Sequence, residues 1–303
     1  MTKLKLIFLI FTIYLIESSD TTGQGCSDAG FCTINSFKPN GSNPTSLKNQ
    51  IKLGAFIGKA DHSISVSGAY LEYNKQVNQK IGLDVKLTSI SQSGNGISVF
   101  GLSDIFVNAN YNASDKVKFS IGSKIPLSDG NKTQKNIPLP MDYQSSLGTF
   151  DLIIGIATTI KDVQIVAAIQ QPLTQNKNGF LSLYYPLDSQ LYNFQSTNQF
   201  ERSGDILMRI SYPILINPKF KLTPSLLPIY HLKNDQYTDE TLIKREIVGS
   251  QGLTVNGNVY LDYDINTKSS LQLNAGIPLK VRDARPDGLT RSAIISFEFR
   301  TKF

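Results

Sequence analysis

The sequence predicts an all-β protein: a transmembrane antiparallel β-barrel of about twelve strands, preceded by a cleaved signal peptide. A short apolar run near the N-terminus is typical of export, and apolar residues alternate with polar ones from about Gln50 to the final aromatic residue, Phe303. After residue 17 no stretch is long and apolar enough for a membrane-spanning helix. Because only helices and closed barrels satisfy their backbone hydrogen bonds in hydrocarbon, a membrane protein with this sequence must be a barrel.

Export is indicated by Lys3 and Lys5, which precede an apolar run at residues 6–16. This run is about half as long as a membrane-spanning helix and is typical of a signal peptide. We interpret residues 1–25 as that signal, because they end on the small-residue pattern Gly-Gln-Gly. A lipidated Cys26 is the alternative, although a lipoprotein signal favours an aliphatic residue where this chain has glycine.

The segment after the signal, residues 26–49, has no strand periodicity. We expect it to form either a plug in the periplasmic mouth or a loose tail before the barrel at residues 50–303. The chain's two cysteines, Cys26 and Cys32, lie in this segment. An oxidising compartment favours a disulfide between them, with free thiols as the alternative. The two histidines are distant in sequence from the cysteines and from each other, so no metal site is expected.

The formal net charge of +6 is modest, and the lysines and arginines are scattered singly along the chain. A nucleic-acid-binding protein would concentrate them on one face. We therefore expect contact with an anionic lipid surface and no nucleic-acid partner.

Period-two alternation is clearest at residues 104–111, where Ile, Val, Ala and Tyr alternate with Asp, Phe and Asn. A soluble β-sandwich with one buried face is the competing interpretation of such a pattern. The last strand, residues 292–303, favours the barrel, because Ala, Ile, Phe, Phe, Thr and the terminal Phe303 share one face. This ending resembles the signal that bacterial outer-membrane proteins present to the barrel-assembly machinery, which we expect to be a partner.

Counting such segments predicts twelve strands, although one missed hairpin would give fourteen. Tight connections alternate with long ones, and short turns belong to the periplasmic side of outer-membrane barrels. This parity predicts that both termini are periplasmic. The predicted strands lie near residues 50–60, 63–75, 79–92, 100–113, 116–127, 148–160, 162–173, 203–215, 218–231, 252–265, 268–281 and 290–303.

Charged residues on the polar face of these strands are expected to line the lumen. If Asp104 and Asp205 face inward, Lys124, Arg209 and Arg300 are candidate partners across the interior. The alternative is that such ion pairs only make the wall rigid. The predicted lumen charges are Asp104, Lys118, Lys124, Asp205, Arg209, Glu298 and Arg300.

Four segments resemble a known family: GLSDIFVNANY (101–111), FSIGSKIPLSDG (119–130), LPMDYQSSLGTFDLIIG (139–155) and RPDGLTRS (285–292). They look like the outer-membrane channels associated with the meta-cleavage pathway of phenol degradation, which are related to FadL-type transporters of hydrophobic compounds. The N-terminal GQGCSDAGFCTIN looks like the start of members from the Bacteroidota. The resemblance implies an outer-membrane barrel of a Gram-negative bacterium that admits small apolar or aromatic compounds. With about twelve strands and no long N-terminal hatch, this chain departs from the FadL pattern itself.

An aromatic-rich loop between residues 174 and 202 could receive an apolar ligand outside the cell, or its rings could belong to the aromatic girdle of the membrane interface. Its candidate mouth residues are Phe180, Tyr184, Tyr185, Tyr192 and Phe194.

An enzyme is not expected, because neither His62 nor His231 has a recognisable serine motif beside it. The sequence also lacks nucleotide-binding glycine patterns, so no cofactor is expected and passage would be passive. A structural barrel with a filled lumen is the remaining alternative.

Overall fold

The computed structural model describes residues 34–39, 49–288 and 292–303, and every long element in these ranges is a β-strand. No helix within these ranges is long and apolar enough to cross a membrane. The predicted signal peptide and the predicted disulfide between Cys26 and Cys32 lie outside the described residues.

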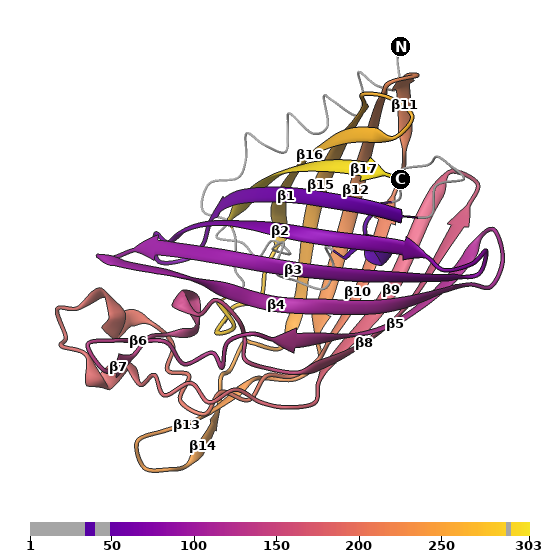
Figure 1. Cartoon of the computed structure of the whole chain (residues 1–303). Coiled ribbons are helices and arrows are strands. Elements are labelled where there is room, and N and C mark those ends of the chain that lie inside the picture. The colour runs from indigo at the N-terminus through magenta and orange to yellow at the C-terminus, as the bar shows by residue number, and fades with distance from the viewer. Residues whose placement is uncertain (1–33, 40–48, 289–291) are drawn as a thin grey trace.

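Antiparallel strands joined in sequence order form the barrel wall (Figure 1). The sheet closes because β1 pairs with β17 along its whole length and β10 pairs with β12. The strands are β1 (Asn49–Lys59), β2 (Ser65–Gln76), β3 (Ile81–Gly94), β4 (Ile97–Asn112), β5 (Val117–Pro126), β8 (Asp151–Ile160), β9 (Val163–Pro172), β10 (Asp205–Ser211), β11 (Ile214–Asn217), β12 (Phe220–His231), β15 (Gly252–Asp264), β16 (Ser269–Lys280) and β17 (Ala293–Lys302).

The thirteen strands of this sheet make a twelve-stranded barrel, because β10 and β11 are two halves of one wall strand. Both halves pair with β12 and are separated only by Tyr212 and Pro213. Proline has no N–H to donate, which interrupts the ladder at this point. The predicted count of twelve is confirmed, and the predicted strand positions agree with the structure to within a few residues at most ends.

One hairpin differs from the prediction. The expected strands 79–92 and 100–113 are longer on their facing ends, so β3 and β4 are joined by only Asn95 and Gly96. Both residues have positive φ values, 52° and 74°, as the tight turn of a two-residue hairpin requires. The ladder therefore continues through a serine- and glycine-rich stretch that lacks a clear apolar alternation.

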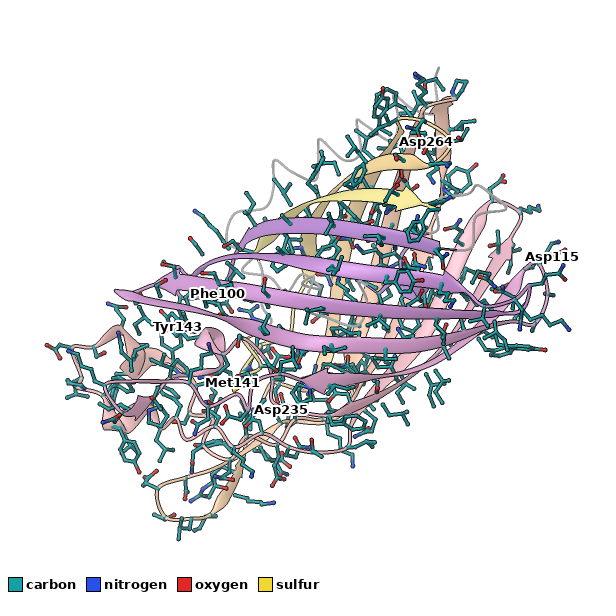
Figure 2. The ribbon with its side chains drawn as sticks, viewed as in Figure 1. Phe100, Asp115, Met141, Tyr143, Asp235 and Asp264 are labelled. Atoms are coloured by element: carbon teal, nitrogen blue, oxygen red, sulfur yellow. The ribbon has the colours of Figure 1, made fainter. Side chains whose placement is uncertain are left out.

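The two ends of the barrel are unequal. Both ends of the described barrel, Asn49 and Phe303, meet through backbone hydrogen bonds at the end that carries most of the short turns. The two-residue β3–β4 turn is the exception, because Asn95 bonds to Tyr143 (3.0 Å) at the other end. Figure 2 places Asp115 and Asp264 at that end and Met141, Tyr143 and Asp235 at the opposite end. The long loops gather there and contain β6 (Thr133–Gln134), β7 (Ile137–Pro138), η3 (Met141–Tyr143), η4 (Ser182–Tyr184), η5 (Gln190–Asn193), β13 (Gln236–Thr238) and β14 (Lys244–Glu246).

A further short helix lies on the N-terminal side of the barrel strands. It is η2 (Asn35–Phe37), and its residues Ser36 and Phe37 are buried. Phe37 belongs to an apolar cluster with inward-facing side chains of β4, β8, β9, β10 and β12, so η2 lies inside the barrel.

Candidate functional site

The wall strands separate their side chains by period two, with apolar groups outside and mostly polar groups inside. On β3, for example, Leu83 and Val85 are exposed on the outer surface, whereas Asp84, Lys86 and Thr88 are buried inside. This sorting makes the interior the candidate functional site. The outer band includes Leu53, Ile57, Leu71, Phe119, Ile121, Ile154, Ile156, Ile206, Leu273, Ile295 and Phe297.

All the predicted lumen charges lie on the inward face of their strands, but their partners differ from those expected. Lys124 forms an ion pair with Asp151 (Nζ to Oδ2, 3.0 Å) rather than with Asp104. Asp104 instead accepts hydrogen bonds from Ser103 (3.0 Å) and Ser146 (2.6 Å). The burial of the predicted set is nearly complete for Asp104, Lys124, Asp205, Arg209, Glu298 and Arg300, while Lys118 is partly exposed.

A chain of alternating charges runs from the N-terminal segment along the inner face of the wall to β12. Lys38 Nζ lies 3.2 Å from Glu298 Oε2, and Glu298 also bonds to Arg300. Arg300 continues to Asp262 (3.1 Å), whose other carboxylate oxygen lies 3.5 Å from Lys221 Nζ. Because each buried charge has an opposite neighbour, the cost of removing it from water is offset.

Residues 34–39 are anchored to the wall by polar contacts. The backbone N–H of Asn35 donates to Glu72 (3.2 Å), and its side-chain oxygen accepts from Lys52 (2.7 Å). The hydroxyl of Ser36 donates to Asp84 (2.6 Å). These contacts reach β1, β2 and β3, so the segment crosses part of the interior rather than lying loosely outside it.

Phe37 anchors the same segment on the other side of the barrel. It is 1% exposed and lies over Gly155, where an added Cβ would be 2.4 Å from the ring carbon Cε1. The absence of a side chain at this glycine is therefore what makes room for the ring. The two apolar residues Ile34 and Phe37 are three apart in a polar stretch, a signal that could have singled out the segment. The surrounding cluster contains Ile34, Phe106, Ile153, Val166, Ala168, Leu207 and Leu227.

At the long-loop end, His231 lies between two carboxylates. Its Nδ1 is 2.7 Å from Asp205 Oδ1 and its Nε2 is 2.7 Å from Asp235 Oδ1. Asp235 Oδ1 also accepts the backbone N–H of Ser203 (2.9 Å), and Asp205 bonds to Arg202. Since both ring nitrogens face carboxylate oxygens, this arrangement favours the positively charged imidazolium, which can donate from both positions.

The same cluster continues into the loop between β16 and β17. Arg282 lies 3.0 Å from Asp287, and Arg202 lies 3.7 Å from it. Burial alone would raise the pKa of Asp287, but these two guanidinium groups lower it below its usual value. The network joins three long loops, and sequence reasoning missed most of its members because they lie outside the predicted strands.

The predicted aromatic mouth divides into two groups. Phe180 and Phe194 are buried in an apolar cluster that joins the long loops to β1–β4, and Phe194 stacks on His62 at 4.0 Å between ring centroids. Tyr185 donates to the carbonyl of Pro138 (3.1 Å), and burial raises the pKa of its hydroxyl. The exposed members are Tyr184 and Tyr192, at 56% and 39%. Whether they receive a ligand remains a prediction.

No metal site is formed by the part of the chain that the structure describes, in which no group of three or more His, Cys, Asp and Glu side chains could hold an ion.

The closed wall, the apolar outer band and the polar interior define a transmembrane β-barrel. An outer-membrane channel from Pseudomonas putida F1 has a similar structure, with a TM-score of 0.58 at 13% identity over 88% of this chain and 99% of that one. The CymD monoaromatic hydrocarbon channel (0.44; 9%; 94% and 99%) and the KdgM porin (0.42; 9%; 84% and 99%) also align. No protein-family model and no curated protein matches the sequence. At 13% identity, the likeness to the Pseudomonas putida channel shows the fold alone.

Proposed function

We propose that this protein is a passive channel for small, mostly apolar or aromatic compounds in the outer membrane of a Gram-negative bacterium. The observation that carries the proposal is the closed twelve-stranded wall, whose outer band is apolar and whose interior is polar. The sequence resemblance to phenol-pathway channels and the structural likeness to an outer-membrane channel support it. Most charged side chains in the lumen form ion pairs, an arrangement that is typical of a structural wall and not of a catalytic site.

The orientation is part of this proposal. All the long loops lie at one end of the barrel, and most short turns and both ends of the described barrel lie at the other, although the two-residue β3–β4 turn is on the long-loop side. In outer-membrane barrels the end with the short turns is periplasmic. The long loops would then face outward, with exposed Tyr184 and Tyr192 on the extracellular side. The strand that ends at Phe303 would be the segment that the assembly machinery recognises.

A lipid hydrolase is disfavoured by the surroundings of His231. Both ring nitrogens already bond to the carboxylates of Asp205 and Asp235, so neither is available to accept a proton from a serine. Wild-type protein should release no fatty acid from phospholipid vesicles. Hydrolysis that disappears in His231→Gln would contradict this assignment.

A structural barrel with a filled lumen is the second candidate, and one observation favours it. Residues 34–39 lie inside the wall, with buried anchors at Lys38 and Phe37, and most charged side chains on the inner face are buried. Passage therefore requires that this segment, or part of the wall, moves. The two candidates differ in whether any solute crosses.

Reconstitution tests the channel. Vesicles containing lipopolysaccharide are preferable to plain phospholipid, because apolar solutes cross ordinary bilayers unaided. We expect the protein to accelerate entry of a small aromatic such as benzyl alcohol more than entry of a disaccharide. If neither solute enters faster than in protein-free vesicles, including with variants that release residues 34–39, the channel proposal fails and the structural barrel is favoured.

A further inference from the structure

A cavity of about 160 Å³ lies at the short-turn end of the barrel, between the N-terminal segment and strands β4, β5, β8 and β9. It is smaller than the pockets that bind drug-sized ligands and larger than a site for one water molecule. Its lining includes Ser36, Lys116, Lys118, Ala157, Gln164 and Val166.

Lys118 supplies a positive charge that the wall does not neutralise. Its neighbour Phe119 is exposed on the outer surface and Ser120 is buried, so alternation directs the Lys118 side chain inward. Its Nζ forms no hydrogen bond or ion pair with residues 34–39, 49–288 or 292–303. Every other predicted lumen charge has such a partner within these ranges.

Two acidic groups lie in the surroundings of this charge, Asp115 in the cavity lining and Asp84 on β3, and neither pairs with Lys118 among the described residues. Asp84 interacts with Lys118 only through space, and both of its carboxylate oxygens are already bonded. Oδ1 accepts from Asn74 (2.7 Å), and Oδ2 accepts from Ser36 (2.6 Å) and Asn110 (2.7 Å). A partly buried ammonium without a partner favours an anionic ligand, because the ligand replaces hydration that burial has removed.

The other lining residues indicate what the uncharged part of the ligand would contact. Ala157 and Val166 belong to or pack on the apolar cluster around Phe37, while Ser36 and Gln164 contribute polar groups. An inorganic anion would use the charge but would leave the apolar side uncovered.

We infer that this cavity binds a small organic carboxylate, with its carboxylate at Lys118 and its apolar body against Ala157 and Val166. The inference deepens the proposed channel function and rests on it only for the passage of that ligand. A solute leaving the lumen toward the short turns would meet this site between the N-terminal segment and the wall.

Equilibrium binding to the full-length, detergent-solubilised protein tests the site without requiring transport. Benzoate is the probe, titrated by calorimetry at low ionic strength so that screening does not mask the charge. We expect Lys118→Met to weaken benzoate binding roughly tenfold or more, because it removes a charge-assisted hydrogen bond. Lys219→Met is the matched control, since it removes one charge from an exposed turn that does not line the cavity.

Two further ligands define the class. Benzyl alcohol has the same ring without the charge and should bind equally to wild type and Lys118→Met. Inorganic phosphate should bind at least tenfold more weakly than benzoate. Lys118→Gln provides a second variant if the methionine variant assembles poorly, as judged by heat-dependent gel mobility.

Equal benzoate affinity in wild type and both Lys118 variants would overturn the inference. Equal binding of phosphate and benzoate would overturn the assigned ligand class. These failures are separable from failure of the channel, because solute flux into vesicles can persist when benzoate binding is lost.

Discussion

The contact between Phe37 and Gly155 offers a direct test of how the N-terminal segment is held in the lumen. Replacing Gly155 with alanine adds one methyl group that would lie 2.4 Å from Phe37 Cε1 and 3.2 Å from the Cβ of Ala168. Non-bonded carbons pack at about 3.5–4.0 Å, so the ring must move by about an ångström or more. With Ala168 behind the new methyl group, that movement displaces the ring from its cluster.

The expected effect on the release of residues 34–39 can be calculated from the burial of the Phe37 ring. Phe37 is 1% exposed, and full burial of a phenylalanine side chain contributes about 1.5–3 kcal/mol. Losing that contribution would raise the population of the released segment by roughly ten- to hundredfold, since about 1.4 kcal/mol corresponds to a factor of ten. The polar anchors at Ser36 and Lys38 remain in the variant.

Hydrogen exchange measured by mass spectrometry reports this population. The backbone N–H of Asn35 donates to Glu72, and those of Phe37 and Lys38 donate to the carbonyl of Ile34. Their exchange should accelerate roughly ten- to hundredfold in Gly155→Ala. Solute flux into vesicles should increase in parallel.

Gly257→Ala is the control, because its new methyl group would be 3.5 Å from the nearest atom of Leu279. This is an ordinary contact, so exchange in residues 34–38 should not change. If Gly155→Ala exchanges within twofold of wild type, Phe37 does not hold the segment as described. If exchange accelerates while flux does not change, the segment is not the barrier to passage.

Three other perturbations test the wall, the loops and a turn. Lys124→Met removes the ion-pair partner of fully buried Asp151 and should lower the free energy of unfolding by roughly 3–5 kcal/mol. The control, Lys244→Met, breaks an exposed ion pair and should lower it by less than about 1 kcal/mol. Urea unfolding in micelles measures both, and equal effects would contradict the assignment. Burial would raise the pKa of Asp287, but two arginines lower it, so its stabilising contribution is complete above about pH 4 and is lost as the pH falls through the lowered value. Loop amides should therefore lose exchange protection below about pH 4 in wild type, and Asp287→Asn should lack that protection at neutral pH as well. Gly96→Ala should destabilise the barrel by about 1 kcal/mol through its φ of 74° alone, because no atom lies within 4 Å of the new methyl group; an unchanged urea midpoint would refute this.

The barrel could be predicted because the pattern that marks each wall strand lies within that strand's own sequence. Period-two alternation identifies a wall strand from its own residues, and the long connections all fall at one end of the barrel, as their alternation with tight turns predicts. The β3–β4 hairpin was the exception. Asn95-Gly96 is a strong turn signal, but Ser91 and Ser93 before it obscure the alternation. The backbone ladder nevertheless continues through this stretch, as far as the pair Gly94 and Ile97.

For the interior, the sequence predicted which charged side chains point inward but not which of them form ion pairs. Period two placed Lys124 and Asp104 inside, but the partner of Lys124 is set by the register between β5 and β8, which brings Asp151 directly opposite. That register depends on the stagger of the closed barrel. Arg202 and Asp287 could not be placed at all, because loops that fold back over a barrel have no periodicity to indicate their contacts.

The difference between the two ends bears on where a channel of this construction would open. Opening the loop end would break several buried charged contacts at once, including Arg202 with Asp287 and His231 with Asp235, and breaking a buried ion pair costs several kcal/mol. At the other end, Ser36 borders a cavity and bonds to the wall through a hydroxyl, a contact that water or a bound carboxylate can replace. Release also separates Lys38 from Glu298, but Glu298 keeps Arg300 as a partner and Lys38 enters water, so no buried charge is left unpaired. Phe37, worth about 1.5–3 kcal/mol, is then a principal barrier to release. We therefore expect passage to be controlled by residues 34–39 rather than by the long loops, so cross-linking the loops should leave flux unchanged while tethering this segment to the wall should abolish it.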